Sequence, residues 1–302
     1  MAAHRVKRAC FAVAMASLVA PARALPTPER VEFPSVENDV TVQALYFRPP
    51  ASTPDKAVPL VIAAHGCGGM YSENPARRDQ LSERSIAWTE TLLADGYAVL
   101  WPDSFNSRGR RSVCLVKRGE PSITPFTRRL DILGALTYAA SRRGIDRKRI
   151  ALVGWSHGGS TTLATVNARD ARIAKFFAGA GAPQHLAGAV AFYPGCGVSL
   201  RKGNDWSPSV PLRIHTGELD DWTPSPTCVA LGDSARQHGA DMAVTVYPGA
   251  YHGFDGPRGK IIVWKEVTTG ANPDKGVTLG PDPAARDAAT QAVRTFLKER
   301  LQ

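Results

Sequence analysis

A serine stands between two glycines in segment 154–158, which reads Gly-Trp-Ser-His-Gly. The apolar stretch 149–154 predicts a buried strand that runs into this segment, and the small residues after it predict a helix packed closely on a sheet. Such a sharp strand-to-helix turn leaves no room for side chains at the glycines and exposes the hydroxyl of Ser156. The first turn of the helix then offers backbone N–H groups to a developing oxyanion. We therefore predict that Ser156 is a nucleophile.

A serine hydroxyl is a weak nucleophile and needs a histidine base that a carboxylate orients. In chains with this turn, the acid and then the histidine follow the serine. His252 fits, because it stands in a loop between two glycines after the apolar stretch 242–248. Four other histidines follow the serine but lie in the turn itself, before a strand, within a strand or at a helix end: His157, His185, His215 and His238. We predict that His252 is the base.

Two neighbouring carboxylates, Asp220 and Asp221, come after the apolar stretch 211–217 and before Pro224. This is where the acid should lie, at the carboxyl end of a strand. One of the two can orient His252 while the other caps the next helix. The spacing of the residues does not choose between them.

A glycine-rich loop, His-Gly-Cys-Gly-Gly at 65–69, begins at the end of the apolar stretch 59–66. The second backbone N–H of an oxyanion hole comes from a loop of this kind. We expect the N–H groups of Cys67 and His157 to face the oxyanion. Cys67 as a nucleophile is disfavoured because no strand-to-helix turn presents it. His65 precedes the serine in the chain and is interpreted as a structural hydrogen-bonding residue.

Several motifs occur in a consistent order over residues 40–299. They are HGCGG (65–69), PDSFNSRG (102–109), Arg129 with Asp131, GWSHGG (154–159), GELDDWTP (217–224) and YHGFD (251–255). Together they resemble the dienelactone hydrolase family of α/β hydrolases. The resemblance implies an α/β-hydrolase fold with a mostly parallel central sheet.

The resemblance also implies a catalytic triad of Ser156, Asp220 and His252. Asp220 is favoured over its neighbour because family members place the acid three residues after the glycine, here Gly217, and four before the proline. Family enzymes that open dienelactone itself carry cysteine at the nucleophile position. The serine of this chain therefore resembles the broader, esterase-like branch of the family.

The elements around the motifs alternate between strand and helix. Apolar stretches predict strands at 40–47, 59–66, 97–102, 149–154, 186–194, 211–217 and 242–248. Helical spacing of apolar residues predicts helices at 79–94, 126–141 and 283–299. This alternation predicts a mostly parallel sheet with helices on both faces. Residues 25–302 are expected to form a single domain, because no low-complexity linker divides them.

Residues 1–24 have the pattern of a secretory signal peptide. A basic start precedes an apolar run of about 12 residues, and Ala-Arg-Ala follows at 22–24. The run is too short for a membrane span, which needs about 20 residues. We expect cleavage before Leu25 and an exported protein, periplasmic or secreted, without a stable membrane anchor. The formal net charge would fall from +10 to +6, because four basic and no acidic residues leave. We find no nucleic-acid-binding motif.

Four cysteines remain after residue 24, and an even number permits two disulfides in an oxidising compartment. In the strand order of the implied fold, the strands ending near residues 66 and 102 are neighbours, as are those ending near 194 and 217. Each expected bridge joins segments that leave one edge of two adjacent strands. The expected pairs are Cys67–Cys114 and Cys196–Cys228. No cysteine or histidine cluster has zinc spacing, and we expect neither metal nor cofactor.

The expected reaction is two-step acyl transfer from a small-molecule ester or lactone through an acyl-serine. A serine peptidase or an acyltransferase would use the same triad. A non-catalytic exported binding protein on this fold would need a degraded triad, which the sequence does not show. Four aromatic residues beside the motifs can line an apolar pocket or belong to the core: Phe105, Trp155, Tyr193 and Trp222.

Overall fold

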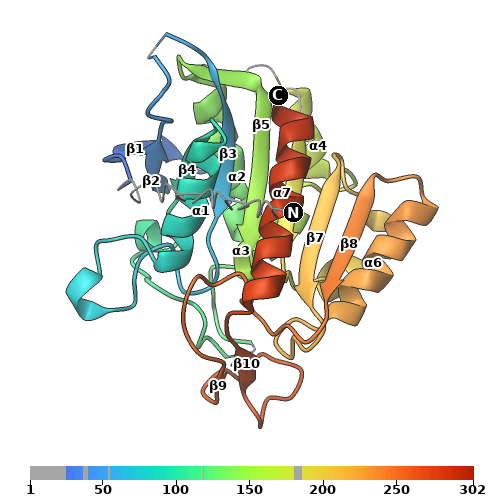
Figure 1. The fold of residues 1–302 in the computed structure, drawn as a ribbon. Coiled ribbons are helices and arrows are strands. Elements are labelled where there is room, and N and C mark those ends of the chain that lie inside the picture. The colour runs from blue at the N-terminus through green and yellow to red at the C-terminus, as the bar shows by residue number, and fades with distance from the viewer. Residues whose placement is uncertain (1–24, 37–39, 54, 118, 180–185) are drawn as a thin grey trace, which may run out of the picture.

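The computed structural model describes residues 25–36, 40–53, 55–117, 119–179 and 186–302. Eight strands within these ranges form one sheet in the order β1-β2-β4-β3-β5-β6-β7-β8 (Figure 1). The strands are β1 (Glu29–Pro34), β2 (Thr41–Phe47), β3 (Val58–Ala64), β4 (Ala98–Pro102), β5 (Ile145–Trp155), β6 (Gly188–Phe192), β7 (Leu212–Gly217) and β8 (Met242–Tyr247). β2 is antiparallel to both of its neighbours, β1 and β4. All other neighbouring strands pair in parallel. The expected signal segment, 1–24, lies outside the described residues.

Helices cover both faces of the sheet. Apolar side chains of α1 (Glu83–Ala94) and α7 (Pro283–Leu301) pack on one face. The other face is covered by α2 (Pro125–Ser141), α3 (His157–Thr165), α4 (Ala171–Ala178) and α6 (Ser225–Gln237). Because both faces are covered, β3, β4 and β6 are buried along their whole length, as their continuous apolar sequences predict. The α/β fold class predicted from the sequence is confirmed.

Two element boundaries lie four residues from their predicted places. The helix predicted from residue 79 begins at Glu83, because the Ser82 side chain accepts a hydrogen bond from the N–H of Ser85 and caps the helix. Leu81 just before it forms a β-bridge with Tyr71. β5 begins four residues before the predicted 149, at Ile145, which pairs with β3 across a register shift.

The sequence pattern predicts neither β1, nor α4, nor the hairpin of β9 (Ile262–Trp264) and β10 (Val277–Leu279). The two hairpin strands have three residues each, which is too short for a periodic signal. Residues 256–281, here called the cover segment, carry this hairpin between the loop after β8 and α7. Figure 1 shows the hairpin beyond one end of the sheet.

The predicted motif loops all leave the carboxyl ends of parallel strands. The loop 65–69 follows β3, the turn at Ser156 follows β5, the loop at Asp220 follows β7 and the loop at His252 follows β8. Parallel strands bring such loops to one edge of the sheet, where α/β folds bind ligands. Within the described ranges, no helix is long and apolar enough to cross a membrane.

Candidate active site

Ser156 occupies the turn between β5 and α3 with φ 53° and ψ −113°, a conformation that non-glycine residues rarely adopt. Both flanking glycines are required by close backbone contacts. A Cβ at Gly154 would lie 2.2 Å from the carbonyl oxygen of Gly158, and a Cβ at Gly158 would lie 1.8 Å from that of Ala64. The tight packing of this turn against β3 therefore fixes Ser156 at the strand end.

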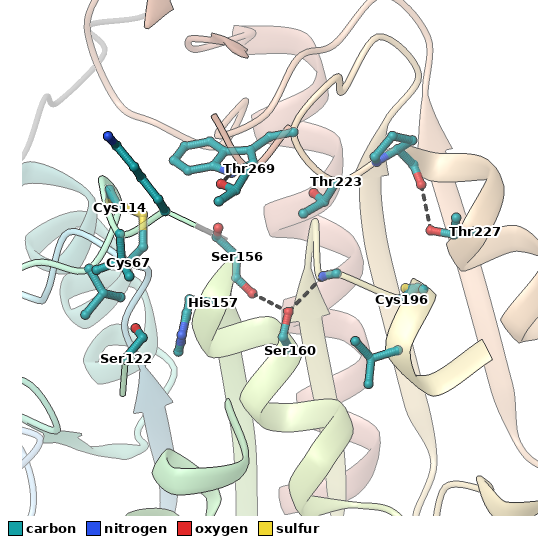
Figure 2. A pocket seen from close by; sticks show the side chains of 18 of the residues that line it. Cys67, Cys114, Ser122, Ser156, His157, Ser160, Cys196, Thr223, Thr227 and Thr269 are labelled. Atoms are coloured by element: carbon teal, nitrogen blue, oxygen red, sulfur yellow. Dashed lines mark hydrogen bonds between the residues drawn. A yellow bond between two sulfur atoms is a disulfide. The ribbon is translucent and has the colours of Figure 1, made fainter. Parts of the chain in front are cut away.

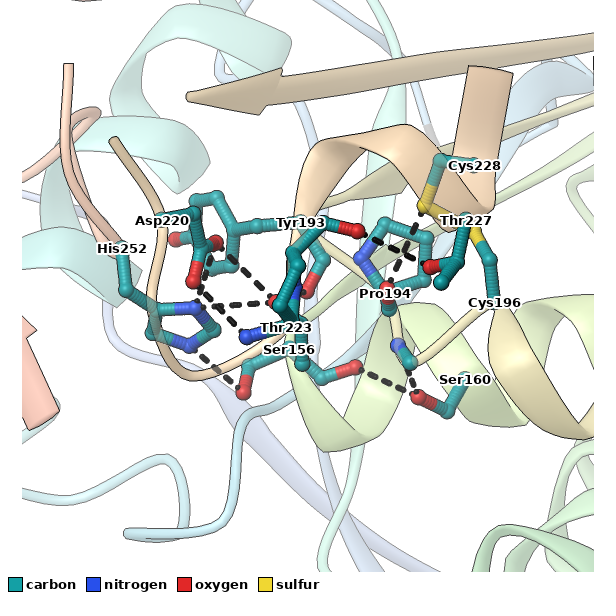
Figure 3. Close-up of a disulfide and its surroundings, with 12 residues drawn as sticks. Ser156, Ser160, Tyr193, Pro194, Cys196, Asp220, Thr223, Thr227, Cys228 and His252 are labelled. Atoms are coloured by element: carbon teal, nitrogen blue, oxygen red, sulfur yellow. Dashed lines mark hydrogen bonds and ion pairs between the residues drawn. A yellow bond between two sulfur atoms is a disulfide. The ribbon is translucent and has the colours of Figure 1, made fainter. Parts of the chain in front are cut away.

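A continuous chain of hydrogen bonds joins the three residues predicted as a triad (Figure 3). Nε2 of His252 lies 2.9 Å from Oγ of Ser156, and Nδ1 of His252 lies 2.8 Å from Oδ2 of Asp220. Asp220 and His252 are both buried, with exposed fractions of 4% and 3%. Because the carboxylate is an acceptor, Nδ1 carries the imidazole proton and Nε2 is free to accept the serine proton.

The carboxylate of Asp220 is held by its own turn. Oδ1 accepts the backbone N–H groups of Trp222 (2.9 Å) and Thr223 (2.8 Å). The hydroxyl of Thr223 lies 3.0 Å from Oδ2, the oxygen that faces His252. These donors fix the direction in which the carboxylate approaches the imidazole.

The neighbouring Asp221 points elsewhere. Its carboxylate accepts the backbone N–H of Thr278 (2.7 Å) and the hydroxyl of the same residue (2.8 Å). It does not cap the next helix, because the N-cap residue of α6 is Pro224. The sequence spacing did not distinguish the two aspartates, but their hydrogen bonds do: Asp220 contacts His252, and Asp221 contacts the cover segment.

The imidazole of His252 is packed between two aromatic rings. Its centroid lies 4.5 Å from that of Tyr193 and 4.8 Å from that of Trp222. Tyr193 has a positive φ of 35°, and burial raises the pKa of its hydroxyl well above the ordinary value. The hydroxyl therefore stays protonated and donates to Asp255.

Asp255 is a buried acceptor that anchors the loop of His252. Besides the Tyr193 hydroxyl, it accepts Nε of Arg84 (3.0 Å) and Nε1 of Trp88 (2.8 Å). Arg84 also donates to the carbonyl oxygen of Gly253. The last residue of the YHGFD motif thus ties the histidine loop to α1.

The two expected oxyanion donors lie on segments that meet beside Ser156. Cys67 is in the loop after β3, and His157 is the first residue of α3. A cation links these segments: Nη1 of Arg128 donates to the carbonyl oxygen of His65 (2.8 Å) and lies 3.0 Å from Nδ1 of His157. Burial, with the charge of Arg128, lowers the pKa of His157 to about 3, so its ring is neutral and accepts this bond.

Arg128 is a residue that the sequence motifs do not single out. It comes from α2 and is almost fully buried, and burial lowers the pKa of its guanidinium to about 9. The guanidinium therefore remains charged at neutral pH. The one signal in the sequence is a pair of arginines within the apolar positions of a predicted helix, and its partners could not be read from spacing.

The Arg129 and Asp131 of the family pattern do not pair with each other. Arg129 forms an ion pair with Asp170 (2.7 Å), and Asp131 forms one with Arg108 (2.7 Å). Because Arg108 belongs to the PDSFNSRG motif, the second pair ties that motif to α2. Asp131 is fully buried.

The remaining described histidines form no hydrogen bond with Ser156. Nδ1 of each lies within hydrogen-bond distance of a local oxygen: Gly66 O for His65, the Tyr247 hydroxyl for His215 and Ser234 O for His238. This agrees with their interpretation as structural residues. His185 lies outside the described residues.

Both disulfides have the pairing expected from the strand order. Cys67 is bonded to Cys114 with an S–S distance of 2.03 Å, and Cys196 to Cys228 with 2.06 Å. The first joins the loop after β3 to the segment after β4, and the second joins α5 (Gly197–Arg201) to α6 at their N-terminal ends. Both bridges border the site (Figures 2 and 3).

Ser156 lies where two pockets meet. The first, of about 530 Å³, is here called the α5 pocket; its lining includes Val113, Val116, His157, Cys196, Val198 and Thr227 (Figure 2). The second, of about 590 Å³, is here called the cover pocket; its lining includes Tyr71, Tyr193, His252, Ile262, Trp264 and Leu279. Cys67, Cys114, Ser156 and Trp222 line both. Among the described residues, no group of histidine, cysteine and acidic side chains could hold a metal ion.

Comparison with known proteins agrees with the motifs. The sequence model of the dienelactone hydrolase family matches residues 47–301. The chain belongs to the dienelactone hydrolase family. This makes it a hydrolase by class, and the resemblance stated from the sequence is confirmed.

Two solved structures of similar fold are esterase-like. A dienelactone hydrolase-like promiscuous phosphotriesterase from metagenomic libraries is 17% identical with a TM-score of 0.62, over 92% of this chain and 100% of that one. Esterase 2 of Thermogutta terrifontis, phosphorylated by paraoxon, is 17% identical with a TM-score of 0.61, over 91% and 95%. At this identity the likeness shows the fold alone.

A curated relative matches part of the sequence. Quorum-quenching protein AidA of Acinetobacter baumannii (strain MDR-ZJ06) is 34% identical over 150 residues. The match covers 49% of this chain and 41% of that protein, so it spans less than half of either.

Proposed function

We propose that the protein is a serine hydrolase that cleaves carboxylic ester or lactone bonds. The observation that carries the proposal is the unbroken chain from the strained Ser156 through His252 to the buried Asp220, with bonds of 2.9 Å and 2.8 Å. This is the arrangement that activates a serine hydroxyl for acyl transfer. Membership of the dienelactone hydrolase family and the likeness to esterase folds support it.

In the first step, Oγ of Ser156 attacks the carbonyl carbon while Nε2 of His252 takes the hydroxyl proton. The oxyanion is held by the N–H groups of Cys67 and His157. The imidazolium, stabilised by Asp220, then gives its proton to the leaving oxygen, and the carbon–oxygen bond breaks. An acyl-serine and a free alcohol result.

In the second step, a water molecule takes the place of the alcohol. His252 accepts a proton from the water as it attacks the acyl-serine, and the same oxyanion donors hold the second intermediate. Collapse returns the proton to Ser156 and releases the carboxylic acid. For a lactone, alcohol and acid are parts of one open-chain product.

A peptidase or an acyltransferase would use the same three residues. The acceptor and the leaving group distinguish them: product analysis with ester and amide substrates, in water and with added alcohols or amines, separates the three reactions. We expect hydrolysis of esters to exceed both amide cleavage and transfer to added acceptors.

Replacement of Ser156 tests the proposal. Ser156→Ala should abolish hydrolysis of a panel of p-nitrophenyl esters and labelling by a fluorophosphonate. The free energy of unfolding should change by less than about 1 kcal/mol, because a half-buried hydroxyl contributes little to packing. A variant that keeps near wild-type kcat on these esters would end the serine-hydrolase proposal.

We also propose that the protein works in an oxidising compartment after export. Support comes from the secretory pattern of residues 1–24 and from the two disulfides. N-terminal sequencing of protein from a periplasmic or culture-medium fraction should start near Leu25, and non-reducing peptide mapping should find both bridges. Uncleaved protein with four free thiols in these fractions contradicts the proposal.

A further inference from the structure

Different catalytic groups border the two pockets. His252 lines the cover pocket and not the α5 pocket, whereas His157, an expected oxyanion donor, lines the α5 pocket and not the cover pocket. Cys67 and Ser156 line both. The serine therefore stands on a boundary with the base on one side and an oxyanion donor on the other.

The tetrahedral intermediate formed on Ser156 places different substituents toward the cover pocket and toward the α5 pocket. Its carbon carries Oγ of Ser156, the oxyanion, the leaving oxygen and the acyl chain. The leaving oxygen must come within hydrogen-bond reach of Nε2 of His252 to receive the proton. With the oxyanion between Cys67 and His157, the acyl chain is the substituent that points away from His252.

We propose that the leaving group occupies the cover pocket and the acyl chain the α5 pocket, so that the cover segment selects the alcohol. This assignment rests on the proposed ester hydrolysis. The cover segment, which lies between the histidine loop and α7, is then the substrate-selecting element of this chain.

The walls of the two pockets suit different groups. In the cover pocket, Trp222 and Trp264 meet edge to face, with ring centroids 6.1 Å apart and an interplanar angle of 87°. Ile262 and Leu279 complete this side. Aromatic rings placed this way favour an aryl or bulky apolar alcohol. The lining of the α5 pocket includes three valines, Val113, Val116 and Val198, that suit an alkyl chain; charged side chains also line it, namely Lys117, Glu120 and Arg201.

Asp221 is the positioning residue for the wall of the cover pocket. Its carboxylate holds Thr278 of β10 at two atoms, and its carbonyl oxygen accepts the N–H of Ala271 (2.8 Å). Nε1 of the adjacent Trp222 donates to Thr269 (3.1 Å). The turn that carries the catalytic acid thus holds the cover segment through four hydrogen bonds.

The test measures kcat/KM for two ester series with each variant, relative to the full-length disulfide-bonded wild type, so that intrinsic ester reactivity cancels. One series fixes the acetyl group and varies the alcohol through ethyl, benzyl and 1-naphthyl. The other fixes p-nitrophenol and varies the acyl group through acetyl, butyryl and hexanoyl. The variants are Trp264→Ala in the cover pocket and Val198→Trp in the α5 pocket.

Trp264→Ala should lose about 10-fold on benzyl and naphthyl acetates relative to ethyl acetate, and change all p-nitrophenyl esters by one common factor. Val198→Trp should lose about 10-fold on the hexanoate relative to the acetate, and change all acetates by one common factor. The reverse pattern overturns the assignment while leaving ester hydrolysis intact. A wild type that hydrolyses none of the esters overturns both proposals.

Asp221→Asn separates positioning from simple destabilisation. We expect its KM to rise about 10-fold for 1-naphthyl acetate relative to ethyl acetate, with a smaller change in kcat, and the KM of all p-nitrophenyl esters of the acyl series to change by one common factor. Asp274→Asn, an exposed acid of the same cover segment, is the matched control and should leave both constants unchanged. An equal loss of kcat for every ester would show that Asp221 only supports the fold.

Discussion

The guanidinium of Arg128 donates to Nδ1 of His157 over 3.0 Å while the same nitrogen donates to the carbonyl oxygen of His65. One buried nitrogen of α2 therefore fixes the loop that carries Cys67 relative to the turn that carries His157. An oxyanion hole made from two separate segments needs such a link, because a misplacement of about 1 Å costs about 10²-fold in rate.

Arg128→Lys should lower kcat about 10- to 100-fold with little change in KM, because the lysine ammonium stands on a flexible chain and lacks the rigid, planar guanidinium that places Nη1 between the two acceptors. Arg129→Lys is the matched control, since Arg129 pairs with Asp170. Steady-state kinetics on one ester and urea unfolding of both variants check this. Equal kcat losses in the two lysine variants would contradict a specific role for Arg128.

Asp220→Asn should lower kcat by up to about 10⁴-fold and leave the fold intact. An amide at this position can donate to Nδ1 of His252, and the ring proton then moves to Nε2. A protonated Nε2 can no longer accept the serine proton. Asp221→Asn should cost far less in kcat, because its carboxylate faces Thr278. Measurement of kcat for both variants on ethyl acetate tests this prediction. A larger loss of kcat in Asp221→Asn than in Asp220→Asn would assign the role of the acid to Asp221.

Local sequence patterns predicted the parts of the site that backbone geometry fixes. A Cβ at Gly154 or Gly158 would lie only 2.2 Å or 1.8 Å from a backbone oxygen, so both positions require glycine. The turn could therefore be predicted from a segment of five residues. His252 could be singled out as the candidate base because it is the one histidine after the last strand predicted from the sequence, and it lies in a glycine-flanked loop. The disulfide partners followed from strand order, since loops leaving adjacent strands meet.

Long-range side-chain contacts were not predictable in the same way. Asp221 and Thr278 are 57 positions apart, and nothing in either neighbourhood points to the other. The partners of Arg128 come from the ends of β3 and β5, which meet only once the sheet has formed. The cover segment lacks a regular spacing of apolar residues, so the sequence does not indicate that it borders a pocket. Only the folded structure places its side chains in the lining of the cover pocket.

Loss of each disulfide should lower the free energy of unfolding by about 2–4 kcal/mol, because the bridges close chain segments of 47 and 32 residues. The kinetic effects should differ. Replacing Cys67 and Cys114 together by alanine should also lower kcat, since that bridge holds the loop that carries Cys67, the proposed oxyanion donor. The Cys196/Cys228 double variant should keep kcat on acetates. Urea unfolding and kinetics test this, and equal kcat losses in the two double variants would argue against it.

Acid should destabilise the fold through its buried neutral histidines. Burial, with the charge of Arg128, lowers the pKa of His157 from 6.5 to about 3, and burial, with the charge of Arg213, lowers that of His215 from 6.5 to about 4. Because these folded-state values lie below the unfolded value, the unfolded chain binds protons that the folded chain does not. Stability is therefore fully present above pH 6.5 and falls as the pH drops toward 4 and then 3.

A variant of His215 isolates the contribution of one buried histidine to the pH dependence of stability. Nδ1 of His215 lies within hydrogen-bond distance of the Tyr247 hydroxyl, and the ring forms no hydrogen bond with Ser156. His215→Asn should be less stable than wild type at neutral pH. Between about pH 6 and pH 4.5, the free energy of unfolding of the variant should fall less steeply than that of wild type. The difference between the two slopes should reach up to about 1.4 kcal/mol per pH unit. His238→Asn, at an exposed helix end, is the control for the substitution itself. Urea unfolding across this range measures the slopes, and parallel curves for wild type and His215→Asn would sink the prediction.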